Sequence, residues 1–181
     1  MTQELIELRQ SILEGRYDDA LEIVDDLEAM SKQGTLRKIE AFLVRLVIHL
    51  IKNQIEQRLT NSWIASISDS VIQIAKLNIK DNQRYYYIKS DEWGEYLAEA
   101  VEMAIRPASA EIFGGTLKPS QVSQRLQVKE LIDFAENLLF LTYEYQPKEL
   151  AKMIDNYLAE LPGGEDWFSF WQLGIFNQNI S

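Results

Sequence analysis

Hydrophobic residues recur at intervals of three and four along most of the chain, which is the spacing that predicts helices. No stretch shows a convincing alternation typical of a strand. The apolar positions separate into stretches that we predict to be helices: 3–14, 18–32, 35–59, 61–77, 91–105, 128–145 and 148–161. Because these helices differ in length, the pattern favours an all-α fold, an irregular helical bundle of about seven helices.

The stretch over residues 35–59 is apolar around most of its circumference. The polar strip that remains consists of Lys38, Arg45, His49, Lys52 and Glu56. A helix with so wide an apolar face is expected at the centre of a bundle. We therefore predict that six side chains of this helix and the next are mostly buried: Phe42, Leu43, Leu46, Leu50, Trp63 and Ile67.

Glycine and capping residues mark the first predicted boundaries. Gly15 ends the first helix with a permissive backbone. Gly34 and Thr35 are expected to break the chain before the third helix, and Thr60 or Asn61 to cap the fourth.

The later boundaries follow from a loss of periodicity and from proline. Residues 78–91 are expected to form a loop or short extended piece, with Ser90 or Asp91 capping the next helix. Pro107 should kink that helix or begin its continuation. Two glycines and a proline within residues 114–119 mark the clearest hinge.

Residues 14–20, EGRYDDA, resemble the start of the second helix of a tetratricopeptide repeat. Such repeats recur about every 34 residues and need about three copies to form a stable array. One period after Gly15 lies His49, and no G-x-Y-x-x-A pattern follows it. The sequence therefore excludes a repeat array.

Composition excludes several kinds of chemistry. The 181 residues include no cysteine and one histidine, so disulfides, thiolate metal sites, thiol catalysis and histidine-rich metal centres are excluded. The first ten residues favour a helix over a secretory signal, and no apolar run is long enough to span a bilayer. We expect a cytoplasmic protein with no cofactor and no membrane partner.

The net charge of −10 is unevenly distributed. Residues 14–30 carry seven acids against one base, residues 31–90 ten bases against four acids, and residues 91–112 six acids against one base. An acidic protein repels phosphate backbones at long range, which disfavours nucleic acid as a partner. Residues 80–89, KDNQRYYYIK, are the exception, because tyrosines among basic residues can stack the bases of a single strand.

Three stretches carry a family resemblance: VDDLEAM at 24–30, LVRLVIHLIK at 43–52 and SWIASISDSVIQI at 62–74. They resemble the helical family called domain of unknown function 29, which is found largely in cyanobacteria. The matching positions are Asp25, Asp26, Leu27, Glu28, His49, Leu50, Ile51, Lys52, Trp63 and Ile67. The helix at 96–104 is similar to the family's later alanine- and glutamate-rich helix.

The resemblance spans about residues 8–112 and implies no known activity. The chain departs from the family pattern at Asn53 and Gln54, where an aromatic residue and Gln-Pro are usual, and at Ser31, where glycine is usual. We expect one helical domain over residues 1–181. Its parts are a family-like core at 1–112, additional helices at 113–160 and an aromatic tail at 161–181.

Acidic side chains at helical spacing raise the alternative of an enzyme. All-α nucleotide pyrophosphatases use carboxylates of two helices to hold magnesium against a substrate phosphate. The chain offers two such sets, whose candidate metal ligands are Glu22, Asp25, Asp26, Glu99 and Glu102. Carboxylates on solvated helix faces are also ordinary in an acidic protein. We therefore predict no metal site and keep a magnesium-dependent phosphohydrolase as the alternative function.

His49 lies at the border of the apolar stripe, beside Arg45, Lys52 and Glu56. A catalytic histidine needs an orienting carboxylate and a nucleophile, and no motif here supplies them. We favour a structural imidazole that hydrogen-bonds to a neighbouring helix.

The end of the chain is aromatic. Trp167, Trp171 and Ile175 share one face of a short predicted helix, and Phe168 lies beside them. We expect this face to dock as a lid on the helices at 128–145 and 147–160, because so much exposed aromatic area favours aggregation. The alternative is the groove of a partner or a second copy, which makes Trp167, Phe168, Trp171 and Ile175 the partner-binding candidates.

The leading hypothesis is a non-enzymatic acidic helical protein that binds another, unidentified protein through its acidic faces. The phosphohydrolase is the second hypothesis, and single-stranded nucleic-acid binding through residues 80–89 is the third. The sequence leaves open whether the protein forms a homo-oligomer.

Overall fold

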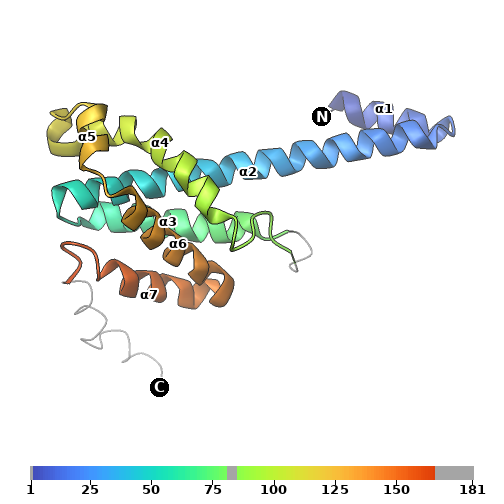
Figure 1. Cartoon of the computed structure of the whole chain (residues 1–181). Coiled ribbons are helices and arrows are strands. Elements are labelled where there is room, and N and C mark those ends of the chain that lie inside the picture. Colours follow the sequence, from blue (N-terminus) through green and yellow to red (C-terminus); the bar gives the residue numbers. More distant parts are fainter. Residues whose placement is uncertain (1, 81–84, 166–181) are drawn as a thin grey trace, which may run out of the picture. The chain divides into compact units, whose positions relative to one another are not determined.

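Seven α-helices and one short 3-10 helix form the computed structural model, which describes residues 2–80 and 85–165 (Figure 1). Their bounds are α1 Thr2–Leu13, α2 Tyr17–Glu56, α3 Asn61–Asn78, α4 Trp93–Glu111, η1 Ile112–Gly115, α5 Pro119–Arg125, α6 Val128–Glu144 and α7 Pro147–Leu158. Within these two ranges there is no strand, and the all-α prediction is confirmed. No helix in the described ranges is long and apolar enough to cross a membrane.

The chain divides into two compact units, residues 1–38 and the residues from 39 onward. The boundary between them falls inside α2. The first unit contains α1 and the first part of α2. The second contains the rest of α2 and all the helices that follow.

The predicted break at Gly34 and Thr35 is wrong, because α2 runs through both residues without interruption. A single glycine inside a helix costs only about 1 kcal/mol relative to alanine, so good helix formers on both sides can outweigh it. Thr35 Oγ1 also donates a hydrogen bond to the carbonyl of Ser31, 3.2 Å away, which satisfies the hydroxyl within the helix.

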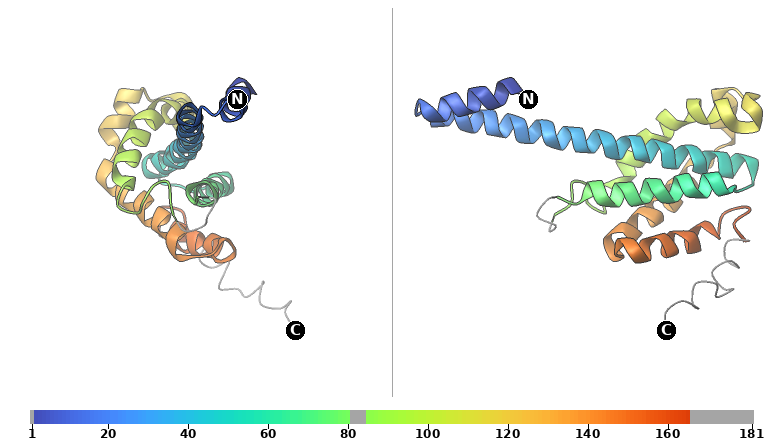
Figure 2. Two further views of the ribbon diagram at one scale, coloured as in Figure 1. Left: turned by 90° about the vertical axis from the view of Figure 1, so that its right-hand side faces the viewer. Right: turned by 180° about the vertical axis from the view of Figure 1, so that it is seen from behind.

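The core of the second unit forms where α3 packs on α6 and α7, and α4 packs on α6 (Figure 2). The predicted core side chains Leu43, Leu46, Leu50, Trp63 and Ile67 are buried. Phe42 is half-buried. The second half of α2 thus presents most of its girth to the interior, as its wide apolar stripe predicts.

Capping and backbone geometry set the helix ends. The Thr60 side chain accepts a hydrogen bond from the Trp63 amide at 3.3 Å, as predicted. The helix α4 begins at Trp93, later than expected, because residues 91–92 form a turn in which the Glu92 carboxylate accepts a bond from the Lys89 amide at 2.7 Å. Pro107 lies inside α4 without ending it.

The predicted hinge at 114–119 coincides with a turn of the chain. Phe113, Gly114 and Gly115 all have positive φ angles in η1, and Pro119 then occupies the first turn of α5.

The expected loop over residues 78–91 begins one residue later than predicted, because Asn78 ends α3; its other described residues are non-helical, and side chains hold them in place. Asn78 donates to the Ile88 carbonyl at 2.8 Å and accepts from the Ile88 amide at 2.7 Å. The Tyr143 hydroxyl donates to the same carbonyl at 2.8 Å and accepts from Trp93 Nε1 at 2.7 Å. Burial raises the pKa of Tyr143 to about 12, so the phenol stays protonated and keeps donating this bond.

Candidate functional site

The first unit is a two-helix hairpin, which we call the N-terminal hairpin (residues 2–38). The helix α1 returns alongside the first turns of α2 in an antiparallel arrangement (Figures 1 and 2). Gly15, with φ of +74°, makes the turn between them, and the Arg16 amide closes it by donating to the Ser11 carbonyl at 2.8 Å. The small side chains of Ser11 and Ala20 are buried, which lets two helices approach closely.

The N-terminal hairpin leaves many large apolar side chains in solvent. The side chains of Leu13, Tyr17 and Leu21 are 76%, 66% and 61% exposed. Counting these three, eight large hydrophobic residues of the hairpin are exposed: Leu5, Ile6, Ile12, Leu13, Tyr17, Leu21, Val24 and Met30. So many exposed large apolar side chains within one small unit are typical of a surface that binds another molecule.

A groove of about 380 Å³ lies between the two helices of the hairpin, and carboxylates dominate it. Its charged lining residues are Glu7, Arg16, Asp19, Glu22 and Asp26. With four acids against one base, the groove attracts cationic groups such as the side chains of lysine and arginine.

Arg16 organises one end of this groove. Its guanidinium donates to the Glu14 carboxylate at 2.8 Å and to the Asp19 carboxylate at 2.5 Å. The hydrogen bond to Asp19, followed by the one to Glu14, raises the pKa of Arg16. Bonds from Gln10 and then Arg16 lower the pKa of Glu14, so both groups stay charged at neutral pH.

The carboxylates predicted as metal candidates fall on both units. Glu22 and Asp26 line the same groove, whereas Glu99 and Glu102 belong to α4 in the second unit. Asp18, Asp19, Glu22, Asp25 and Asp26 are all exposed. Among the described residues, no group of three or more histidines or carboxylates is arranged to hold a metal ion. Whether a metal binds in solution stays a prediction.

Three of the positions that carry the family resemblance, His49, Lys52 and Trp63, meet in the second unit. Lys52 Nζ lies 4.6 Å and the Arg58 guanidinium carbon 4.7 Å from the centroid of the Trp63 ring, both as cation–π contacts. The His49 ring lies 6.4 Å from the Trp63 ring, centroid to centroid. Lys52 is only 5% exposed and forms an ion pair with Glu111. The cluster joins the end of α2 to α3 and α4.

His49 does not show the surroundings of a catalytic histidine. Burial, followed by the nearby positive charge of Lys52, lowers the pKa of His49 from 6.5 to about 4, and Glu111 only partly opposes this. Its Nδ1 has no hydrogen-bond partner within the described ranges. The imidazole packs against Trp63 of the neighbouring helix and does not form the predicted hydrogen bond, so a structural role for His49 stays a prediction.

Two polar residues that the sequence did not mark as site residues, Asn53 and Glu56, complete the cluster. Asn53 is buried and donates to the carbonyls of Arg58 and Pro162, both at 2.9 Å. The Glu56 carboxylate accepts from the Phe113 amide at 2.9 Å. The signal for Asn53 was its departure from the family pattern directly after the H-L-I-K positions. The cluster therefore holds the turn at η1 and the chain at Pro162 against the end of α2.

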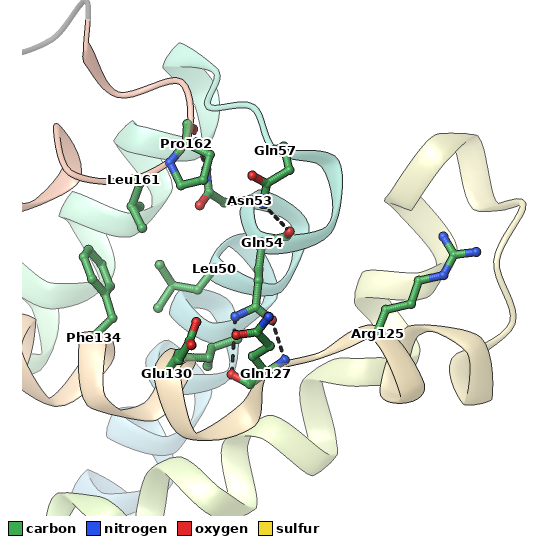
Figure 3. Close-up of a pocket in the computed structure, with 11 residues that line it drawn as sticks. Leu50, Asn53, Gln54, Gln57, Arg125, Gln127, Glu130, Phe134, Leu161 and Pro162 are labelled. Atoms are coloured by element: carbon green, nitrogen blue, oxygen red, sulfur yellow. Dashed lines mark hydrogen bonds between the residues drawn. The ribbon is translucent and has the colours of Figure 1, made fainter.

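A pocket of about 360 Å³ adjoins this cluster (Figure 3). Its apolar wall consists of Leu50, Leu131, Phe134, Leu161 and Pro162, and its polar lining of Asn53, Gln54, Gln57, Arg125, Gln127 and Glu130. Gln54 fixes one side by accepting from the Gln127 amide at 2.9 Å and donating to the Gln127 carbonyl at 3.3 Å. Figure 3 shows Arg125 directed away from the other lining side chains.

The tyrosines proposed as a base-stacking surface are partly used within the protein. Tyr86 packs edge-to-face on Tyr143, with centroids 4.6 Å apart, and Lys80 lies over the Tyr87 ring at 5.5 Å. Tyr85 is 63% exposed. Residues 81–84 of this segment lie outside the described residues.

The aromatic tail also lies outside the described residues. This applies to all four partner-binding candidates: Trp167, Phe168, Trp171 and Ile175.

Comparison with known proteins agrees with the resemblance. A family model described as "Domain of unknown function DUF29" matches residues 7–128. The match continues past residue 112 and includes η1 and α5, although it carries no information on the expected cyanobacterial distribution. No curated protein and no solved structure shows a significant match. The chain therefore belongs to the family called domain of unknown function DUF29.

Proposed function

We propose that this protein is a non-enzymatic binding protein that holds another protein on its N-terminal hairpin. The observation that carries the proposal is the set of eight exposed large apolar side chains on the same two helices that form a groove lined by four carboxylates. These eight side chains stay exposed although α1 and α2 pack against each other, so the hairpin has an apolar surface that neither helix covers. A third helix from a partner would bury that face.

Charge indicates the kind of partner. Residues 14–30 carry seven acids against one base, and these acids flank the apolar positions of α2. An amphipathic helix with lysine or arginine beside its apolar face would bury Leu13 and Leu21 and place its cations near Glu22 and Asp26. Anionic lipid and nucleic acid fit this surface poorly, because its carboxylates repel them.

The same charge argues against a second copy at this surface. A symmetric contact brings the same patch of both subunits together, so the acidic residues of one hairpin would face those of the other. This like-charge juxtaposition disfavours self-association through the N-terminal hairpin. A homo-oligomer through another surface stays an open prediction.

A photo-crosslinking experiment tests the proposal. A benzophenone amino acid replaces the exposed Tyr17 in the full chain, crosslinked proteins from the native host are identified by mass spectrometry, and the main partner is purified. Its affinity is then measured for the wild type, for the Leu13→Ser/Leu21→Ser variant, and for the control Met103→Ser. Met103 is 64% exposed on α4, so the control removes a comparable exposed side chain from the other unit.

The hairpin variant should bind on the order of tenfold more weakly or worse, because loss of two apolar anchors costs more than about 1.4 kcal/mol. Met103→Ser should bind as the wild type does, and the wild-type affinity should fall as salt is added. Equal affinity of all three proteins, or the absence of any crosslinked protein, would overturn the proposal.

A further inference from the structure

We propose that Trp167 inserts its indole ring into the pocket formed by the end of α2, the start of α6 and residues 161–162. The pocket thus serves as an internal docking site for the aromatic tail of the same chain. This inference concerns the second unit and does not depend on the proposed function of the N-terminal hairpin.

The shape and lining of the pocket fit an indole. Leu50, Phe134 and Leu161 point toward one another on one side of the pocket, and Gln54, Gln127 and Glu130 lie on the other (Figure 3). A buried tryptophan needs apolar contact for its ring and an acceptor for its N–H. The carboxylate of Glu130 and the side-chain carbonyl of Gln57 are acceptors within the same lining. The volume of about 360 Å³ lies at the lower end of ligand-pocket sizes, which suits one ring system better than a large ligand.

The residues that precede the tail are held in a fixed position at the edge of the pocket. Leu161 and Pro162 line the pocket themselves, and Asn53 holds the Pro162 carbonyl at 2.9 Å. Gly163 packs so closely on the backbone at Leu59 that an added Cβ would lie 2.8 Å from its nitrogen. The Gly164 amide donates to the Leu161 carbonyl at 2.8 Å, which closes a turn directly after the residues that line the pocket.

Chain length allows Trp167, the first aromatic residue of the tail, to reach the pocket. Trp167 is the fifth residue after Pro162, so an extended chain spans at most about 18 Å between them. Phe134 and Leu131 line the same pocket as Pro162 and are therefore within reach of its side chain. Trp171 follows four residues later. An intramolecular ring held this close also has a high effective concentration, which favours it over a free partner.

Fluorine NMR on the full chain tests this inference. Labelling with 5-fluorotryptophan gives one signal for each of the four tryptophans, and single Trp→Phe substitutions assign them. A soluble paramagnetic agent then reports which rings are accessible to solvent. Trp63 and Trp93 are buried and define the protected reference. We expect the Trp167 signal to be protected like theirs at every protein concentration tested.

Two matched substitutions on α6 locate the docking site. Phe134→Glu places a carboxylate in the pocket and should abolish the protection of Trp167. Phe140→Glu changes a similarly half-buried phenylalanine of the same helix that does not line this pocket, and should leave the Trp167 signal unchanged. Circular dichroism and the Trp63 and Trp93 signals establish that both variants are folded.

Three results would overturn the inference. Trp167 as accessible as a free tryptophan in the wild type would show that it does not dock. Protection that survives Phe134→Glu would place the ring elsewhere. Protection that disappears on dilution would identify a second copy as the source of the ring. A failure of any kind here leaves the crosslinking result at Tyr17 unaffected.

Discussion

His49 lies beside Lys52 and Arg45 and packs on Trp63, so its protonation is linked to folding. Its pKa is about 4 in the folded protein and near 6.5 when unperturbed. Between these values the unfolded chain binds a proton that the folded chain does not, so stability is fully present above about pH 6.5 and falls as pH falls toward 4. Between pH 6.5 and 4 we expect the His49 titration to lower the free energy of unfolding of the wild type by an amount on the order of 1–3 kcal/mol. The His49→Gln variant should not show this part of the decrease.

Urea denaturation of both proteins from pH 7 to pH 4 measures this difference. The carboxylates titrate in both proteins, so their effect on stability cancels in the comparison. Because the chain has one histidine, its imidazole NMR signals also give the pKa of His49 directly. A pKa above 6, or equal pH dependence of the two proteins, would contradict the prediction.

Leu46 tests the core at the same scale. Its side chain is fully buried in the second half of α2. Leu46→Ala should lower the free energy of unfolding by about 2–5 kcal/mol, because truncation leaves a cavity. Leu13→Ala, a change of the same atoms at a position that is 76% exposed, should cost under about 0.5 kcal/mol. A loss well under 1 kcal/mol for Leu46→Ala would show that this part of α2 is not packed as described.

The burial of a single residue could be predicted where helical spacing alone decides it. The apolar stripe of α2 specified Leu43 and Leu46 as core residues because helical spacing alone decides which side they share. Lys52 and Glu56 were assigned to a polar strip, yet both are held by partners from other elements, namely Trp63, Glu111 and the Phe113 amide. Contacts between segments this far apart in the chain cannot be deduced from periodicity.

At the scale of the element, two glycines allow a matched comparison. An added Cβ would meet no atom within 4 Å at either Gly34 or Gly15, but only Gly15 has a positive φ. Gly34→Ala should therefore stabilise the protein by about 0.5–1 kcal/mol, since alanine favours the helix. Gly15→Ala should destabilise it by roughly 1–2 kcal/mol, since a Cβ disfavours the left-handed conformation. Equilibrium denaturation decides, and a destabilising Gly34→Ala would indicate a real break in α2.

The helices themselves were largely predictable, but their exposure was not. Leu5, Ile12 and Leu21 have the same helical spacing as the buried Leu43 and Leu46. A stripe looks the same in the sequence whether or not another element covers it. The N-terminal hairpin is therefore a candidate site that only the fold reveals.

At the scale of the whole molecule, the carboxylates of the alternative enzyme hypothesis are divided between two units. Calorimetry with magnesium or manganese should show no binding, because hard cations need several oxygen ligands at fixed positions and these acids are solvated helix-surface groups. The measurement is made on the full chain at neutral pH. A micromolar isotherm that disappears in Asp26→Asn would instead favour the phosphohydrolase.

The continuity of α2 across the two units has a consequence for local opening. Residues 39–56 of this helix contribute to a buried core. Residues 17–38 pair with the 12-residue α1 only along their first turns and leave several apolar side chains in solvent. Amide hydrogens along this single helix should therefore exchange in two regimes, slowly in its second part and quickly in its first. A partner on the N-terminal hairpin would slow exchange in the first regime and leave the second unchanged, so α2 would report occupancy of the hairpin before the partner is identified.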